Sequence, residues 1–96
     1  MTRDEICEKV EEMGLEDEEI ILFDGMENAF LGISERFEEH GHRYFAVYSY
    51  KKMVSILRGR FGRDMSREDA MEYLEFNTVG LYAGPSTPAI LRDMEG

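Results

Sequence analysis

The sequence predicts an α+β domain in which a small antiparallel sheet of three to four strands packs against two or three helices. Residues 19–50 contain short apolar and aromatic runs separated by polar turns, whereas residues 51–80 carry apolar residues at helical spacing. The length of 96 residues allows one domain, and an apolar share of 43% is enough for a compact core. We therefore expect a single domain over residues 1–96 with the element order α-β-β-β-α-α-β.

Residues 1–14 are the first expected element, an acidic N-terminal helix. Thr2 is followed three residues later by Glu5, which is the pattern of a capping box. An apolar stripe at helical spacing begins at Ile6. Gly14 is suited to end the helix, because glycine accepts the conformation that many C-caps require.

Residues 19–50 predict a β-meander. The three expected strands are Glu19–Asp24, Ala29–Phe37 and Tyr44–Tyr50. The first is a continuous apolar run, which suits a strand covered on both faces. Gly32 in the second strand predicts a bulge or a close approach of the backbone. Short polar turns between consecutive strands favour antiparallel pairing.

Residues 51–80 predict two helices, and residues 81–96 a short strand and tail. Lys51–Phe61 is amphipathic at the helical period. Ser66, followed by two acidic residues in the first turn, predicts the start of the second helix. The two prolines of the tail favour an edge strand or a loop. The alternatives for that strand are Leu81–Ala83 and Ala89–Leu91.

The net charge of −10 is unevenly distributed. Residues 1–27 hold eleven acidic residues against two basic ones, whereas residues 51–67 hold six basic residues against one acidic residue. The two segments could face each other within one fold, face each other across a homodimer, or meet different partners. A sequence pI of about 4.6 argues against direct nucleic-acid binding, because the acidic segment would repel a duplex.

The acidic helix is a candidate partner-binding surface. Its candidate residues are Glu8, Glu11 and Glu12. Such a helix can imitate nucleic acid and occupy the basic groove of a protein, although acidic helices are more often solvated faces. The expected partner is a protein.

Recognisable catalytic motifs are absent from the sequence. It contains no Gly-rich phosphate loop, no HExxH or CxxC pattern, and no Ser-His-Asp or Cys-His arrangement of familiar spacing. We therefore expect no enzyme activity, no cofactor and no metal. His40 and His42 stand beside two glutamates, but no third well-spaced ligand is visible, so a solvated turn is favoured.

The setting expected from composition is the cytoplasm. Leaving tyrosine aside, the longest apolar run has four residues, which is far too short to span a membrane. The single cysteine, Cys7, has no partner in the chain for a disulfide, which is consistent with a reducing compartment.

Asp24 and Gly25 follow the first apolar run and raise the question of chemistry. Asp accepts local backbone hydrogen bonds and Gly takes positive φ, so the pair predicts a turn. A strand followed by Asp-Gly is also similar to the haloacid dehalogenase phosphatases, but Leu22 occupies the position of their nucleophilic aspartate. A turn is therefore favoured over catalysis or metal binding with Glu27.

Four other polar residues are candidates for a pocket between the sheet and the helices. They are Glu35, Arg36, Glu75 and Asn77. Asn77 falls on the apolar side of its predicted helix, where its amide must find hydrogen bonds. Arg36 could pair with Glu75 across the core or bind an anionic ligand. These residues support an alternative function, a small-ligand-binding or hydrolytic domain.

Three stretches together resemble a family of small acidic proteins of tailed phages and prophages. They are ILFDGMENAFLGISER, AVYSYKKMVSIL and MSREDAMEYLEFNTVGLYAGPSTP, and the likeness covers about residues 20–90. The EYLEF-N-x-x-G stretch at residues 72–80 is the most recognisable part. The resemblance implies a viral or mobile-element setting, and it assigns no activity and no catalytic residue. The expected function is a non-catalytic protein-binding module.

Overall fold

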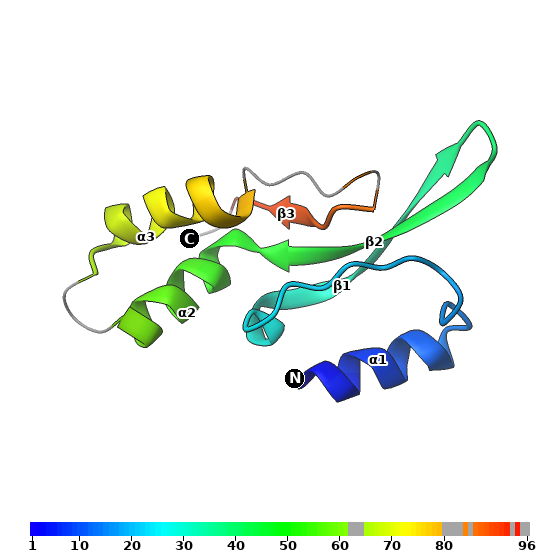
Figure 1. The fold of residues 1–96 in the computed structure, drawn as a ribbon, viewed down its shortest axis with the longest axis horizontal. Helices are drawn as coiled ribbons and strands as arrows, with labels where there is room; N and C mark the ends of the chain where they lie inside the picture. Colours follow the sequence, from blue (N-terminus) through cyan, green and yellow to red (C-terminus); the bar gives the residue numbers. More distant parts are fainter. Residues whose placement is uncertain (62–64, 80–83, 85, 93, 95–96) are drawn as a thin grey trace.

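The computed structural model describes residues 1–61, 65–79, 84, 86–92 and 94. These residues form an α+β fold, as the sequence predicts. In chain order the elements are α1 (Arg3–Glu12), β1 (Phe30–Glu38), β2 (Gly41–Ser49), α2 (Tyr50–Phe61), α3 (Arg67–Leu74) and β3 (Ala89–Leu91). Figure 1 shows α2 and α3 side by side at one end, the β1–β2 hairpin extending to the other, and α1 below the hairpin in this view. No helix in the described part is both long enough and apolar enough to cross a membrane.

The sheet is mixed, with the order β1-β2-β3. β1 and β2 pair antiparallel from Phe30 opposite Tyr48 to Glu38 opposite Gly41, and a two-residue turn joins them. The register shifts between Phe30 and Gly32, which confirms the predicted bulge. β3 pairs parallel with β2. The expectation of a purely antiparallel sheet is therefore wrong, because α2 and α3 carry the chain back before β3 joins.

The predicted strand Glu19–Asp24 does not form. These residues have no strand pairing, so the predicted three-stranded meander is a two-stranded hairpin. The apolar run still serves burial, because Ile20, Leu22 and Phe23 pack against the core as an irregular segment. The expected strand Leu81–Ala83 lies outside the described residues, whereas the alternative at Ala89–Leu91 is β3.

The helix starts follow the predicted capping. Thr2 accepts a hydrogen bond from the backbone N–H of Glu5, and the Glu5 carboxylate accepts one from the backbone N–H of Thr2. The C-cap of α1 is Met13, one residue before the expected Gly14, and Gly14 follows it with φ of +76°, the conformation that glycine favours after a helix. Ser66 forms the equivalent box with Asp69 at the start of α3.

α2 begins directly after β2 because Ser49 caps it. The Ser49 hydroxyl accepts a hydrogen bond from the backbone N–H of Lys52, and Ser49 is completely buried. At its C-terminal end, α3 continues into a π-helical turn, Glu75–Val79.

The core lies where one face of the sheet meets α2 and α3. Its fully buried members include Ala46 and Tyr48 from β2, Met53 and Leu57 from α2, and Leu74 from α3. α1 buries only Ile6 among its residues and exposes most of the others. The body is therefore closely packed, while α1 and the tip of the hairpin (residues 35–42) present most of their side chains to solvent.

Candidate functional site

The predicted partner-binding residues lie on the exposed side of α1. Glu8, Glu11 and Glu12 are exposed, and among the described residues they make no ion pair. The acidic series continues through the loop that follows α1. Its exposed members there are Glu16, Asp17, Glu18 and Glu19. The first fifth of the chain therefore presents a carboxylate-rich surface, which we call the acidic surface (Asp4–Glu19).

In the part of the chain that the structure describes, no carboxylate of the acidic surface forms an ion pair. Asp24 pairs with Arg3, whose Nη1 lies 2.5 Å from the Asp24 Oδ1. Arg60 reaches the same region from α2, but it donates to the backbone carbonyl of Gly25 at 3.3 Å. Both contacts lie just beyond Glu19, so they leave the carboxylates of the acidic surface unpaired among the described residues.

Asp24 itself belongs to a turn, as predicted. Gly25 has φ of +82°, and its N–H donates to the Glu27 carboxylate at 3.3 Å. The side chain of Asp24 is 91% exposed. Asp24 therefore positions the chain and pairs with Arg3.

The β1–β2 hairpin carries an aromatic row on the face that looks toward the end of α1. The ring of Phe37 lies 4.1 Å from that of His42, and His42 stacks on Tyr44 at 6.4 Å between centroids. Glu35 accepts from His42 and, at 3.5 Å, from the Tyr44 hydroxyl. Phe37 is 81% exposed, so the row ends in an unshielded ring near the tip of the hairpin.

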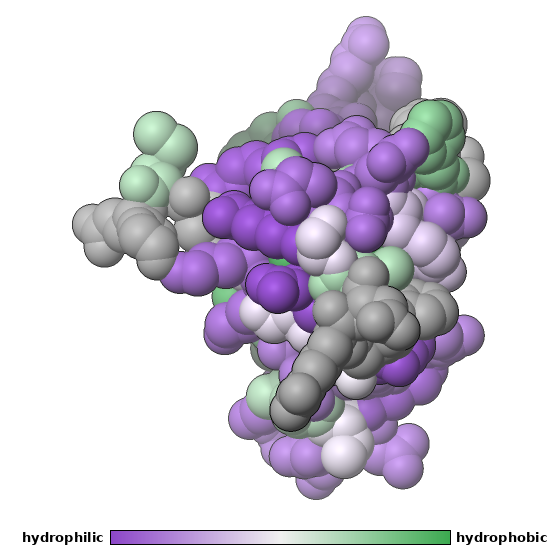
Figure 2. Space-filling view, turned by 90° about the vertical axis from the view of Figure 1, so that its left-hand side faces the viewer, coloured by the Kyte–Doolittle hydropathy of each residue, from purple (hydrophilic) through white to green (hydrophobic). Residues whose placement is uncertain are grey.

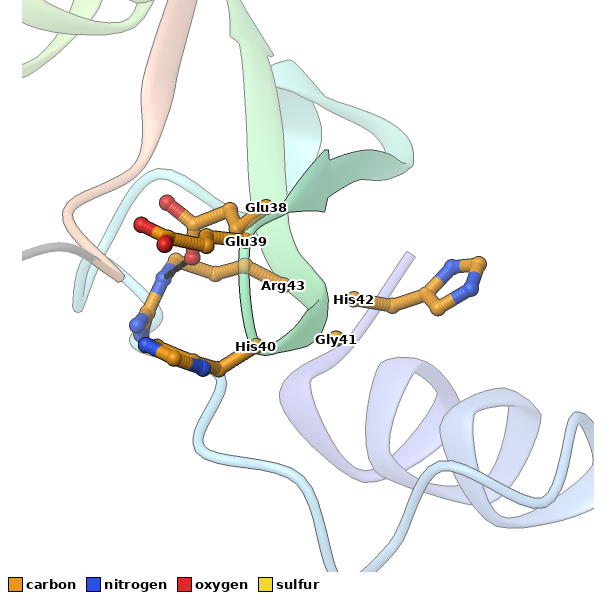
Figure 3. A pocket seen from close by; sticks show the side chains of 6 residues that line it. All are labelled: Glu38, Glu39, His40, Gly41, His42 and Arg43. Atoms are coloured by element: carbon orange, nitrogen blue, oxygen red, sulfur yellow. Dashed lines mark hydrogen bonds and ion pairs between the residues drawn. The ribbon is translucent and has the colours of Figure 1, made fainter.

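The two histidines of the hairpin turn do not converge. Figure 3 shows His42 pointing away from the other side chains that line a cavity of about 310 Å³ at the tip. On the other side of the tip, Arg43 donates to Glu38 at 2.5 Å and to the buried Ser86 hydroxyl at 3.3 Å. Within the described ranges, no three His, Cys, Asp or Glu side chains gather as metal ligands would.

A groove separates the end of α1 from the hairpin. A cavity of about 230 Å³ is lined by Met13, Leu15, Ile33, Glu35 and Tyr44. Met13 is 58% exposed, and the other apolar members are half-buried. Partial burial of the ring, together with the nearby carboxylates of Glu35 and Glu18, raises the pKa of the Tyr44 hydroxyl above its ordinary value. An apolar floor and an acidic rim thus meet at one place.

The four residues proposed for a shared pocket occupy separate surroundings. Glu35 belongs to the groove, whereas Arg36 lies over the Phe45 ring at 5.2 Å and approaches Glu38 at 4.0 Å. Consecutive strand residues point to opposite faces, which separates Glu35 from Arg36. Glu75 pairs with Arg92 at 2.9 Å, so the anticipated pairing of Arg36 with Glu75 across the core is not formed.

Asn77 lies in the π-helical turn after α3. Its Nδ2 donates to the Tyr73 carbonyl at 3.0 Å. It helps to line a cavity of about 280 Å³ between the N-terminal loop, α2 and α3. The lining residues are Leu22, Phe23, Asp24, Met26, Leu57, Arg60, Tyr73 and Asn77. The sequence offered no sign of the π turn, so it could not place Asn77 beside Asp24 and Arg60.

The end of the molecule that carries α2 and α3 is mainly hydrophilic. Figure 2 looks onto this end and shows hydrophobic residues as small separate areas among polar ones. Comparison of the chain with profiles of protein families, with curated proteins and with solved structures yields no significant match.

Proposed function

We propose that this chain is a non-catalytic protein-binding module whose acidic surface engages a basic surface of a partner protein. The observation that carries the proposal is the exposure of Glu8, Glu11 and Glu12 on α1 without an ion-pair partner among the described residues. A strongly acidic surface of this kind accelerates association with a partner of opposite charge and selects against acidic competitors.

A sharper form of the proposal makes the chain an acidic inhibitor of a host nuclease or defence complex. Enzymes that act on nucleic acids carry basic grooves that contact phosphates, and a row of carboxylates can occupy such a groove. The resemblance to small acidic proteins of tailed phages and prophages supports a host-cell cytoplasm as the place of action. The partner would then be a host or viral protein, and the chain would not contact nucleic acid itself.

The test is affinity capture from host lysate with and without nuclease treatment, at low and at high salt. We expect one stoichiometric protein partner that survives nuclease and is weakened by salt, because salt screens exposed charges. The triple variant Glu8→Lys, Glu11→Lys, Glu12→Lys should lose this partner. The matched control reverses three exposed acids away from α1: Glu39→Lys, Glu68→Lys, Glu72→Lys. Equal retention of the partner by both triple variants contradicts the proposal.

The alternative function, small-ligand binding, is favoured by the cavity that Asn77 lines. This cavity has a volume of about 280 Å³. The buried Leu57 forms its floor, and Asp24, Arg60 and Asn77 contribute polar groups to its wall. Ligand sites usually occupy roughly 300–1,000 Å³, so a ligand here would be small. A thermal-shift screen with nucleotides and divalent metals tests this function, because a ligand of the native state raises the melting temperature. A flat screen argues against it.

A further inference from the structure

The groove between α1 and the hairpin has the chemistry of a side-chain receptor. Its floor is formed by Met13, Leu15, Ile33 and the ring of Tyr44, and Glu35 stands at its wall. The volume of about 230 Å³ lies below that of a usual small-molecule site but suits one large apolar side chain. All its lining residues are in the described part of the chain, and none belongs to the core cluster of fully buried residues.

Carboxylates lie beside this apolar floor. Glu35 lines the groove itself, and Glu18 lies near enough to act on the Tyr44 hydroxyl. Glu11 and Glu12 belong to the last turn of α1, immediately before Met13. An occupant that fits both the floor and the rim must therefore be apolar at its centre and cationic at its flanks.

The aromatic row continues the groove along the hairpin. Phe37, His42 and Tyr44 follow one another on the same face, and the ring of Phe37 is 81% exposed. An exposed aromatic ring attracts Lys and Arg through its quadrupole, and this attraction adds to the charge of neighbouring carboxylates. The row thus extends the recognition of cations beyond the rim of the groove.

We propose that the groove receives one apolar or aromatic side chain of a partner segment whose flanking Lys or Arg residues contact Glu35, Glu18 and Phe37. This inference rests on the proposed function and specifies the partner segment that the acidic surface selects. The acidic surface steers the partner, and the groove anchors it, in the way that a central desolvated contact dominates many interfaces.

The probe for this inference is a fluorescein-labelled peptide in which a single Phe is flanked by lysines on both sides. Binding is followed by fluorescence anisotropy at low salt. Replacing the Phe of the peptide by Ala should weaken binding by about tenfold or more, as the loss of an anchor residue does. The protein variants Met13→Gln and Phe37→Ser should each weaken binding of the Phe peptide, and both positions are exposed enough to leave the fold intact.

The matched control is Phe76→Ser, because Phe76 is similarly exposed at 75% but lies on the π-helical turn far from the lining residues in the chain. It should bind the peptide as the wild type does. The inference is wrong if the Phe and Ala peptides bind with equal affinity. It is also wrong if Phe76→Ser and Phe37→Ser lose affinity for the Phe peptide equally. Failure of the peptide to bind at low salt also overturns it.

The outcomes separate this inference from the proposed function. If both peptides bind equally and the Glu8, Glu11, Glu12 reversal abolishes binding, the acidic surface acts without an anchor groove. A second copy of the chain is the other occupant to test, by sedimentation velocity. A wild-type dimer that Met13→Gln and Phe37→Ser dissociate would assign the groove to self-association and overturn the inference.

Discussion

The hydroxyl oxygen of Tyr48 accepts a hydrogen bond from the backbone N–H of Phe23 at 2.9 Å. Tyr48 is fully buried in β2, and the rings of Phe23 and Phe30 lie 5.0 and 5.7 Å from its own. This bond attaches the irregular N-terminal loop to the face of the sheet. It takes the place of the strand pairing that the apolar run was expected to make.

Removing that hydroxyl should destabilise the fold. Tyr48→Phe keeps the aromatic contacts but leaves the Phe23 N–H without its acceptor, which costs about 1 kcal/mol of unfolding free energy. Chemical denaturation followed by circular dichroism measures the change. No loss of stability would mean that water replaces the hydroxyl at this site.

Tyr48 also predicts a loss of stability in alkali. Burial raises the pKa of its hydroxyl above the ordinary value of 10.0, and the Glu27 carboxylate adds to this, against the opposing hydrogen bond from Phe23. A raised pKa in the folded state gives stability that is complete below pH 10.0 and is lost as the pH rises through the folded-state pKa. Denaturation at a series of alkaline pH values should show this loss in the wild type and a smaller one in Tyr48→Phe.

Tyr50→Phe should have the opposite effect to Tyr48→Phe. The Tyr50 hydroxyl is buried and finds no hydrogen-bond partner in the part of the chain that the structure describes. Removing an unsatisfied buried group should raise the unfolding free energy by up to about 1 kcal/mol. The ring remains, so the Arg92 guanidinium can still lie over it, as it does at 3.7 Å in the wild type. A destabilisation equal to that of Tyr48→Phe would contradict this account.

Replacing glycine by alanine should change the stability of the fold in opposite directions at two positions. Gly25→Ala places a Cβ at φ of +82° and 2.6 Å from Arg60 Nη2, so it should cost about 1–2 kcal/mol. Gly59 lies in α2 with open space around it, so Gly59→Ala should stabilise the protein by roughly 0.5–1 kcal/mol. Thermal melts of both variants test these predictions, with a lower melting temperature expected for Gly25→Ala and a higher one for Gly59→Ala. Gly25→Ala in an Arg60→Ala background separates backbone strain from the clash.

The capping box of α1 should be visible in the titration of Glu5. Hydrogen bonds from the backbone and hydroxyl of Thr2 lower the pKa of Glu5 below 4.5. The stabilisation is therefore present above pH 4.5 and is lost as the pH falls through the lower folded-state pKa. Thr2→Ala should return the carboxyl titration, followed by NMR, toward its ordinary value. Ser66→Ala removes the equivalent cap of α3 and should leave Glu5 unchanged.

Local signals in the sequence predicted much of this fold. The caps at Thr2 and Ser66, the turn at Gly25 and the bulge at Gly32 were all readable, because each depends on residues that are neighbours in the chain. An apolar run of four residues was not enough to distinguish a strand from a loop packed on a sheet face, since both bury the same side chains.

The candidate site was less predictable, because it depends on which distant residues meet. Exposure of Glu8, Glu11 and Glu12 followed from helix periodicity. Met13 and Tyr44 line the same groove, and predicting this requires knowledge of the strand register. The pairing of Glu75 with Arg92 likewise depends on the parallel pairing of β3 with β2. No local pattern in the sequence predicts that pairing.

The parallel position of β3 also sets the order in which the chain can fold. The β1–β2 hairpin closes through a two-residue turn, and hairpins form within about 1–10 μs. β3 can join only after α2 and α3 have brought the chain back beside β2. This requires closing a much longer loop of chain. Folding φ-values, the ratio of a mutation's effect on the folding barrier to its effect on stability, should therefore be high in the hairpin and low in β3. The Arg92–Glu75 pair should form after the folding barrier has been crossed.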